Sequence, residues 1–206
     1  LNLVKKSKLN INKEDRFVLE IFNTYKRTAQ ILVSQKSPGH STPSNLLVVG
    51  LGRLGQNIIL ETAFQRYTQR SADNIKITVI DRDAIAKVGC LLQDYPQMAS
   101  VCDLEPIQID LSSNTALQHA LPNTGGAPLF DRTYICLGNP ILAIQVSLAL
   151  LEIVNLSNGP FFIRLEKNSG LFNLLRNPIS GHVEKEHLIP FDMYEQTCSY
   201  DLVFGG

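Results

Sequence analysis

Three glycines at a fixed spacing form the segment of this sequence that is best suited to chemistry. Residues 50–55 read Gly-Leu-Gly-Arg-Leu-Gly and follow the apolar run LLVV. Between a strand and a helix, the first glycine permits a tight turn, the second admits a pyrophosphate close to the backbone, and the third lets the helix pack on the strand. We therefore expect Gly50, Gly52, Arg53, Leu54 and Gly55 to contact a nucleotide phosphate. The structural alternative is that the glycines only serve a turn.

A second polar group follows the next apolar run, KITVI. Asp81 ends that run, and a carboxylate at this place in a dinucleotide-binding fold accepts hydrogen bonds from ribose hydroxyls. Arg82 could stack on adenine or pair with a 2′-phosphate. We expect NAD(H) as the cofactor, with NADP, ATP and ADP as alternatives. A solvated Asp81-Arg82-Asp83 turn with no ligand is the structural alternative.

Two further polar positions follow predicted strands. Asp110 ends the third strand, and the turn Gly138-Asn139-Pro140 ends the fourth. Ligands of open α/β sheets bind at the carboxyl ends of the strands, so these residues are candidate ligand contacts. Asn139 fits equally well as a helix cap.

The elements that must position these residues alternate between strand and helix. Buried strands are expected at 46–50, 75–81, 107–110, 133–138 and 161–165, and helices at 53–67 and 141–156, whereas the connection 83–105 reads as less regular. This alternation predicts an α/β fold, a doubly wound, Rossmann-like parallel sheet in the order 3-2-1-4-5. The order reverses between strands one and four, which creates a crevice above Gly52.

The chain divides into three parts. Residues 1–44 form a helical arm and linker, with an amphipathic helix expected from Glu14 onward and a Pro/Ser/Gly-rich linker at 37–45. Residues 45–170 form the Rossmann-like domain. Residues 171–206 are a C-terminal extension expected to lead into a further domain. The chain starts without Met and stops at Gly206, which suggests a piece of a longer protein.

Composition excludes some functions. The chain of 206 residues has 44% hydrophobic and 18% charged residues, and 19 basic residues balance 19 acidic ones. Without net positive charge, nucleic acid is not an expected partner. The longest apolar stretch, 141–156, is interrupted by polar residues and too short for a bilayer, so no direct membrane insertion is expected. Four scattered cysteines without CxxC spacing indicate reduced thiols in the cytoplasm.

No catalytic group is evident. The histidines fall in expected linker, helix or tail positions: His40, His119, His182 and His187. His182 and His187 flank two glutamates, but this charged stretch reads as a solvated helix face, so we expect no metal. Cys136 is expected to be a buried strand residue. We therefore expect no catalytic residues.

The segments LLVVGLGRLGQNIILETA and KITVIDRDA resemble nucleotide-binding domains of the TrkA-N or RCK type, which regulate potassium transport. The resemblance covers residues 45–165 and carries over a glycine loop, an acid after strands two and three, and an arginine in strand five: Gly50, Gly52, Gly55, Asp81, Asp110 and Arg164. Ile109 stands where the family usually has a glycine. The tail IPFDMYEQTCSYDLVFGG resembles the segment that leads into a ryanodine-receptor-like repeat in some bacterial proteins with this domain.

The resemblance implies a non-catalytic module that senses NAD(H) or an adenine nucleotide and passes the signal to a homodimer partner, an attached domain or a transporter. Three alternatives remain. An NAD(P)-dependent oxidoreductase shares the loop but needs a substrate pocket, and a structural or interaction domain needs no ligand. An ATP-dependent adenylating enzyme shares the loop and the Asp-x-Asp of residues 81–83, but its arginine-bearing segment is missing here.

Overall fold

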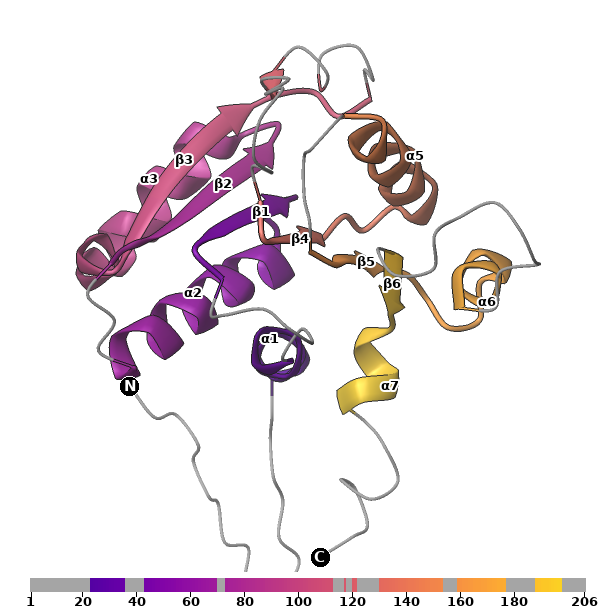
Figure 1. Cartoon of the computed structure of the whole chain (residues 1–206), viewed down its shortest axis with the longest axis horizontal. Coiled ribbons are helices and arrows are strands. Elements are labelled where there is room, and N and C mark those ends of the chain that lie inside the picture. The colour runs from indigo at the N-terminus through magenta and orange to yellow at the C-terminus, as the bar shows by residue number, and fades with distance from the viewer. Residues whose placement is uncertain are drawn as a thin grey trace, which may run out of the picture.

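The structure is a computed structural model. It describes residues 23–35, 43–69, 73–112, 117, 120–121, 130–153, 159–176 and 188–197. Within these ranges the chain forms one sheet of parallel strands with helices on both faces (Figure 1).

The six-stranded sheet has the order β3-β2-β1-β4-β5-β6, and every neighbouring pair is parallel. Its strands are β1 (Asn45–Val49), β2 (Ile75–Asp81), β3 (Cys102–Gln108), β4 (Arg132–Ile135), β5 (Phe161–Arg164) and β6 (Leu188–Phe191). The helices are α1 (Thr24–Ser34), α2 (Arg53–Thr68), α3 (Ala84–Asp94), α5 (Pro140–Leu151), α6 (Gly170–Arg176) and α7 (Met193–Thr197), with a 3-10 turn η1 (Pro96–Ser100). The predicted doubly wound order is confirmed for the first five strands.

Two apolar cores lie on opposite faces of the sheet. One contains side chains of α1, α2, α3 and α7, with Ile58 and Leu32 fully buried. The other contains side chains of α5 and α6, with Leu150 fully buried and Phe172 nearly so. β1 lies in the middle of the sheet and is apolar on both faces, which explains its unbroken run of aliphatic residues.

The connection between β2 and β3 is more regular than expected. It forms α3 and η1 rather than an irregular segment. Gly89 weakens the helix pattern within α3, and the side chain of the N-cap residue Asp83 makes no cap hydrogen bond. Pro96 opens η1 directly after the helix.

The predicted position of the third strand is wrong. β3 runs from Cys102 to Gln108 rather than from 107 to 110, so Asp110 lies two residues beyond the strand rather than at its end. β3 is an edge strand whose residues are mostly half-buried or exposed, and it contains Pro106, which edge strands tolerate. Polar residues alternate along β3, and for this reason the sequence did not indicate the whole strand. The ends of the fourth and fifth strands were also placed too late, because pairing stops at Ile135 and at Arg164.

The helices show smaller differences. Phe64 of α2 is 61% exposed although it is a large apolar residue, and α5 begins at Pro140 after the cap Asn139. The arm helix is described from Thr24 after its cap Asn23; residues 14–22 and the linker residues 36–42 lie outside the described residues. None of the helices in the described ranges is long and apolar enough to cross a membrane.

The C-terminal extension contributes to the same sheet. β6 pairs in parallel with β5, and α7 contacts α1. The sequence did not show this strand because it has only four residues, one of them Pro190. Residues 177–187 and 198–206, which include His182, His187 and Cys198, lie outside the described part of the chain.

A buried arginine anchors α1 beneath the sheet. Arg132, the first residue of β4, is 5% exposed. Its guanidinium donates hydrogen bonds to the carbonyls of Leu32, Val33 and Gln35 at the end of α1, at 3.5, 3.4 and 2.8 Å. The last carbonyls of a helix have no partner within the helix, and a cation there also interacts well with the helix dipole. Arg132 therefore caps α1 from a strand about 100 residues away.

We expect replacement of this arginine to destabilise the protein. Arg132→Met keeps most of the side-chain length but leaves the carbonyls at the end of α1 without this donor, so the free energy of unfolding should fall by about 2 kcal/mol. Urea unfolding followed by circular dichroism measures this. Arg176→Met is the matched control, because Arg176 is 58% exposed and its pair with Glu195 is on the surface; its loss should cost at most a few tenths of a kcal/mol. Equal losses in the two variants would contradict the capping role.

Candidate functional site

The glycine loop joins β1 to α2 at the centre of the sheet. Gly50 has φ +91°, a backbone conformation that other residues rarely adopt, and a Cβ there would lie 2.9 Å from Cδ2 of Leu137. Its amide donates to the carbonyl of Ile80 at 2.8 Å. Gly55 is equally restricted, because a Cβ there would lie 2.3 Å from the carbonyl oxygen of Gly50. The fold itself therefore requires the first and third glycines.

Gly52 is different. Its φ of −81° and ψ of −167° suit any residue, and a Cβ added to it would have no atom within 4 Å beyond its chain neighbours. Gly52 is exposed and precedes α2 without a side-chain cap on the helix amides. Neither backbone strain nor packing explains a glycine here. A group from outside the chain that approaches this backbone closely would explain it.

The rest of the loop presents one cation and one buried side chain. Arg53, the first residue of α2, is exposed. Leu54 is 1% exposed, so its side chain packs in the core and its part in binding is limited to its backbone amide. The structure thus brings Gly52, Arg53 and the first amides of α2 to one surface.

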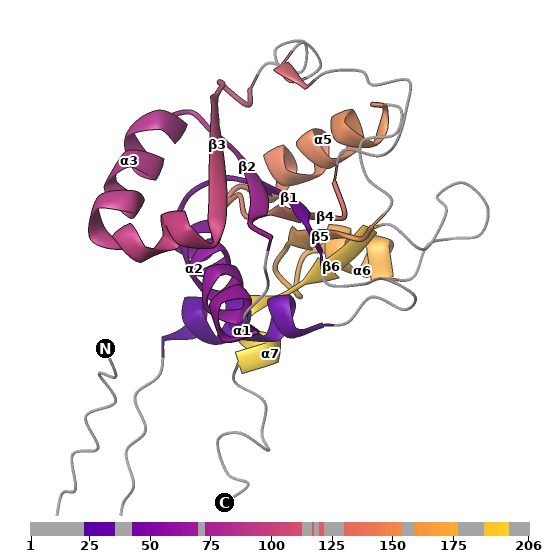
Figure 2. The same cartoon turned by 60° about the vertical axis from the view of Figure 1, so that its left-hand side comes forward.

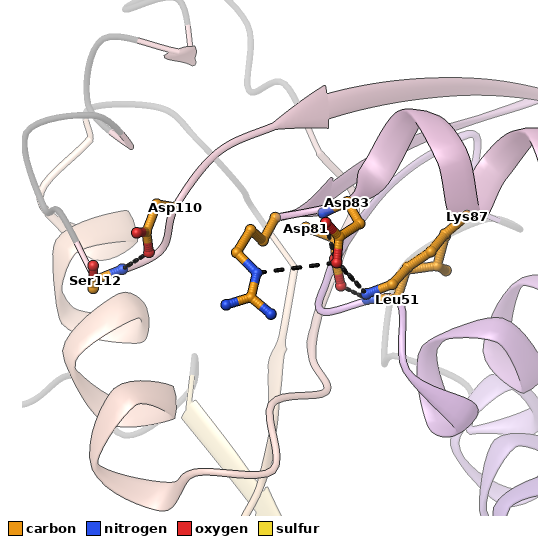
Figure 3. Close-up of polar contacts among 7 residues, drawn as sticks. Leu51, Asp81, Asp83, Lys87, Asp110 and Ser112 are labelled. Atoms are coloured by element: carbon orange, nitrogen blue, oxygen red, sulfur yellow. Dashed lines mark hydrogen bonds and ion pairs between the residues drawn. The ribbon is translucent and has the colours of Figure 1, made fainter.

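Asp81 lies beside the loop and already has several partners. Oδ2 accepts a hydrogen bond from the amide of Leu51 at 2.7 Å, and Oδ1 accepts from the amide of Asp83 at 2.9 Å and from Nζ of Lys87 at 2.5 Å (Figure 3). A carboxylate has about four acceptor positions, so about one remains for a ligand. Asp81 therefore holds the glycine loop and the first turn of α3 together.

The charge of Asp81 is stabilised where it lies. Burial raises the pKa of this carboxyl, but the hydrogen bonds from Lys87, Asp83 and Leu51 together hold its pKa below the usual value. Asp81 is therefore ionised at neutral pH and close to an ammonium group. The sequence analysis did not identify Lys87 as part of this site. The only local indication is its i,i+4 spacing from Asp83, whose carboxylate lies 3.8 Å from Nζ of Lys87.

Arg82 and Asp110 lie near the end of β2. The side chain of Arg82 is 79% exposed, and its Nε lies 4.0 Å from the carboxylate of Asp83. Asp110 is exposed, and its Oδ1 accepts a hydrogen bond from the amide of Ser112 at 3.0 Å. Hydrogen bonds from Ser112 lower the pKa of this carboxyl. In Figure 3, the carboxylate of Asp110 lies beside Ser112 and makes no contact with the group formed by Asp81, Asp83 and Lys87.

The remaining candidates follow β4 and β5. Gly138 is exposed and has room for a Cβ. The side chain of Asn139 caps α5, accepting from the amides of Ile141 and Leu142 at 3.0 and 3.2 Å. The side chain of Arg164, half-buried at the end of β5, makes no hydrogen bond or ion pair with any residue in the described ranges. Asn139 thus serves as the helix cap that the sequence offered as an alternative. The guanidinium of Arg164 is available to bind an anion.

All of these positions lie at one edge of the sheet. Because all six strands are parallel, their carboxyl ends meet at that edge, and the order reverses where β1 separates β2 from β4. α2 covers one side of that point and α5 the other (Figure 1, Figure 2). This is where open α/β sheets bind ligands. A separate cavity of about 310 Å³ lies between α2 and α3, lined by Gln56, Ala86, Lys87, Cys90, Leu91 and Asp94, and includes none of the glycine-loop residues.

Two buried thiols lie in the sheet region. Burial raises the pKa of Cys102 and of Cys136 to about 12 each, which fits the expected buried position of Cys136. The histidines His40, His119, His182 and His187 lie outside the described residues. Within the described residues, no group of three His, Cys, Asp or Glu side chains is arranged to hold a metal ion.

The buried thiols predict a loss of stability at alkaline pH. Unfolded thiols lose their protons near pH 9, whereas the folded ones keep them until about 12, so the free energy of unfolding should fall as pH rises through this window. Urea midpoints at pH 8 and pH 10.5 measure the fall. Cys136→Ala should reduce it, whereas Cys90→Ala should not, because Cys90 is exposed. The same fall in both variants would contradict this assignment.

The comparisons with known proteins give no family assignment. No protein-family model matches the chain, and no curated protein matches its sequence.

Proposed function

We propose that this chain is a regulatory nucleotide-binding module that binds NAD(H) at the carboxyl edge of its sheet and performs no chemistry itself. The observation that carries this proposal is Gly52, a glycine that neither the backbone conformation nor the packing requires. A pyrophosphate that lies against this backbone would explain why the residue is glycine, which has no side chain to block it. The helix amides that follow are suited to an anion.

The charged residues around the loop support the same ligand. Arg53 and Arg164 are cations placed at the start of α2 and at the end of β5, where they can meet phosphate oxygens. Asp81 keeps about one acceptor position for a ribose hydroxyl. ATP, ADP and NADP contain the same phosphate and ribose groups and remain the alternative ligands.

The regulatory role rests on the resemblance of the loop and of Asp81 to TrkA-N and RCK domains. In such a role, nucleotide occupancy is passed to an attached domain, a second copy of the chain or a transporter. Free thiols at Cys90, Cys102 and Cys136 suit a cytoplasmic protein, which is the compartment we propose.

Isothermal titration calorimetry with NAD, NADH, NADP, ATP and ADP tests the proposal. We expect NAD or NADH to bind most tightly. If no nucleotide binds, the proposal is wrong and a structural or interaction role remains. Steady turnover of a dinucleotide with a reducible substrate would favour the oxidoreductase alternative.

A further inference from the structure

Arg53, the cation that follows the glycine loop, contacts α1, a helix that precedes the alternating strands and helices. The guanidinium carbon of Arg53 lies 5.9 Å from the centre of the Tyr25 ring, over its face. Arg53 is exposed and makes no side-chain hydrogen bond or ion pair within the described parts of the chain. A cation is unfavourable at a helix N-terminus, where the dipole is positive, and the Tyr25 ring offsets this for Arg53.

Tyr25 is itself held in place. It is the second residue of α1, whose cap Asn23 accepts hydrogen bonds at Oδ1 from the amides of Tyr25 and Lys26 at 3.0 and 3.3 Å. The ring is half-buried against the core shared by α1 and α2. Arg132 fixes the other end of α1. α1 thus reaches from the start of β4 to the start of α2, and the two helices pack side by side (Figure 2).

We propose that Tyr25 is a positioning residue for the phosphate-binding arginine, and that α1 is thereby part of the nucleotide site. Stacking uses the face of the guanidinium and leaves its N–H donors, which lie in the plane of the group, free to bind phosphate oxygens. The ring removes rotamer freedom that a phosphate would otherwise have to restrict. This inference rests on the proposed function and adds a means of regulation to it.

The coupling must act in both directions. If docked α1 favours nucleotide binding, then bound nucleotide favours docked α1 by the same factor. An exposed cation–π contact contributes about 0.5–1 kcal/mol, which corresponds to a change of about two- to fivefold in affinity. Anything that moves α1 in the protein would then change nucleotide affinity, and nucleotide would change the exposure of α1.

A double-mutant cycle tests the proposal. NAD is titrated into the wild type and into Tyr25→Leu, Arg53→Gln and the double variant, with Tyr25→Phe as the conservative change. Tyr25→Leu should weaken binding about two- to fivefold, Tyr25→Phe should stay close to wild type, and Tyr25→Leu should have no further effect once Arg53 is replaced. The matched control is Tyr67→Leu, because Tyr67 is 68% exposed on α2 and should not matter.

Hydrogen exchange adds a second measurement that does not depend on the variants' affinities. Saturating NAD should slow amide exchange in α1 of the wild type, and slow it less in Tyr25→Leu. If NAD binds but the two substitutions act additively and α1 exchange is unchanged, this inference is wrong while the proposed function stands. If the wild type binds none of the five nucleotides, the proposed function is wrong, and this inference is wrong as well.

Discussion

Gly52→Val should abolish measurable dinucleotide binding while the protein remains folded. The backbone angles of Gly52 suit valine, and the added Cβ has no atom within 4 Å apart from those of its chain neighbours, so we expect the fold to accept the substitution. The branched side chain would instead occupy the space against which a pyrophosphate should lie. We expect a loss of affinity of at least about a hundredfold, equivalent to about 3 kcal/mol or more. Calorimetry with NAD and thermal unfolding of the apo protein measure the two properties separately.

Two other glycines serve as controls. Gly89→Ala lies within α3, where a Cβ also meets no atom within 4 Å, and it should raise stability by about 0.5–1 kcal/mol without changing NAD affinity. Gly55→Ala should impair folding itself, because its Cβ would lie 2.3 Å from a carbonyl oxygen. Unchanged NAD affinity in a folded Gly52→Val protein would show that the nucleotide does not lie at this loop.

Asp81→Ala should affect both binding and stability. Loss of the ribose acceptor should weaken dinucleotide binding about tenfold to a hundredfold. The same change removes the acceptor for the buried amide of Leu51 and the partner of Lys87, so we expect stability to fall by about 2–3 kcal/mol. Asp83→Ala is the matched control. Its carboxylate is half-exposed and caps no helix amide, and the backbone amide that bonds to Asp81 remains.

The stability contribution of Asp81 should depend on acid pH. Because its pKa is lower in the folded protein than in the unfolded chain, its contribution is present above the unfolded value near 3.8 and is lost as pH falls through the lower folded value. Urea midpoints measured from pH 6 down to pH 3 should fall less steeply in Asp81→Ala than in the wild type. A parallel decline in both proteins would contradict the assignment.

The effect of Asp81→Ala on cofactor choice also follows from its surroundings. A free carboxylate repels a 2′-phosphate, so its removal should weaken NAD more than NADP, and Arg82 remains available to the phosphate. The ammonium of Lys87 offsets part of that repulsion, so the difference should be modest. Equal weakening of both cofactors, measured by calorimetry, would show that Asp81 does not read the adenosine ribose.

Much of the fold could be predicted because the central strands are buried on both faces. β1 is aliphatic after Asn45, and all residues of β2 except Lys76 are buried. Gly50 and Gly55 are required by the turn and by helix packing, so the local sequence indicates their position. The edge strands could not be predicted as well. β3 and β6 are polar, short or contain proline, since one side of an edge strand makes no ladder hydrogen bonds.

The sequence predicts which candidate residues lie near the carboxyl edge of the sheet, but not the side-chain contacts among them. The predicted residues lie at or after the ends of β1 to β5, so the parallel order alone brings them to one edge. Lys87 on Asp81 and Tyr25 on Arg53 are side-chain contacts between separate elements, and Tyr25 comes from a helix 28 residues before Arg53. Apart from the i,i+4 spacing of Asp83 and Lys87, no local pattern in the sequence predicts these contacts.

The cap that Arg132 places on α1 has a consequence for synthesis on the ribosome. The guanidinium and the carbonyls that it binds are 97 to 100 residues apart in sequence, and Arg132 reaches them only once β4 has paired with β1. At a translation rate of roughly 5–20 residues per second, α1 is synthesised about 5–20 seconds before Arg132, which caps its C-terminal end. A helix of 11 residues is marginal alone in water, so α1 completes its folding late, after the strand that holds it has been translated.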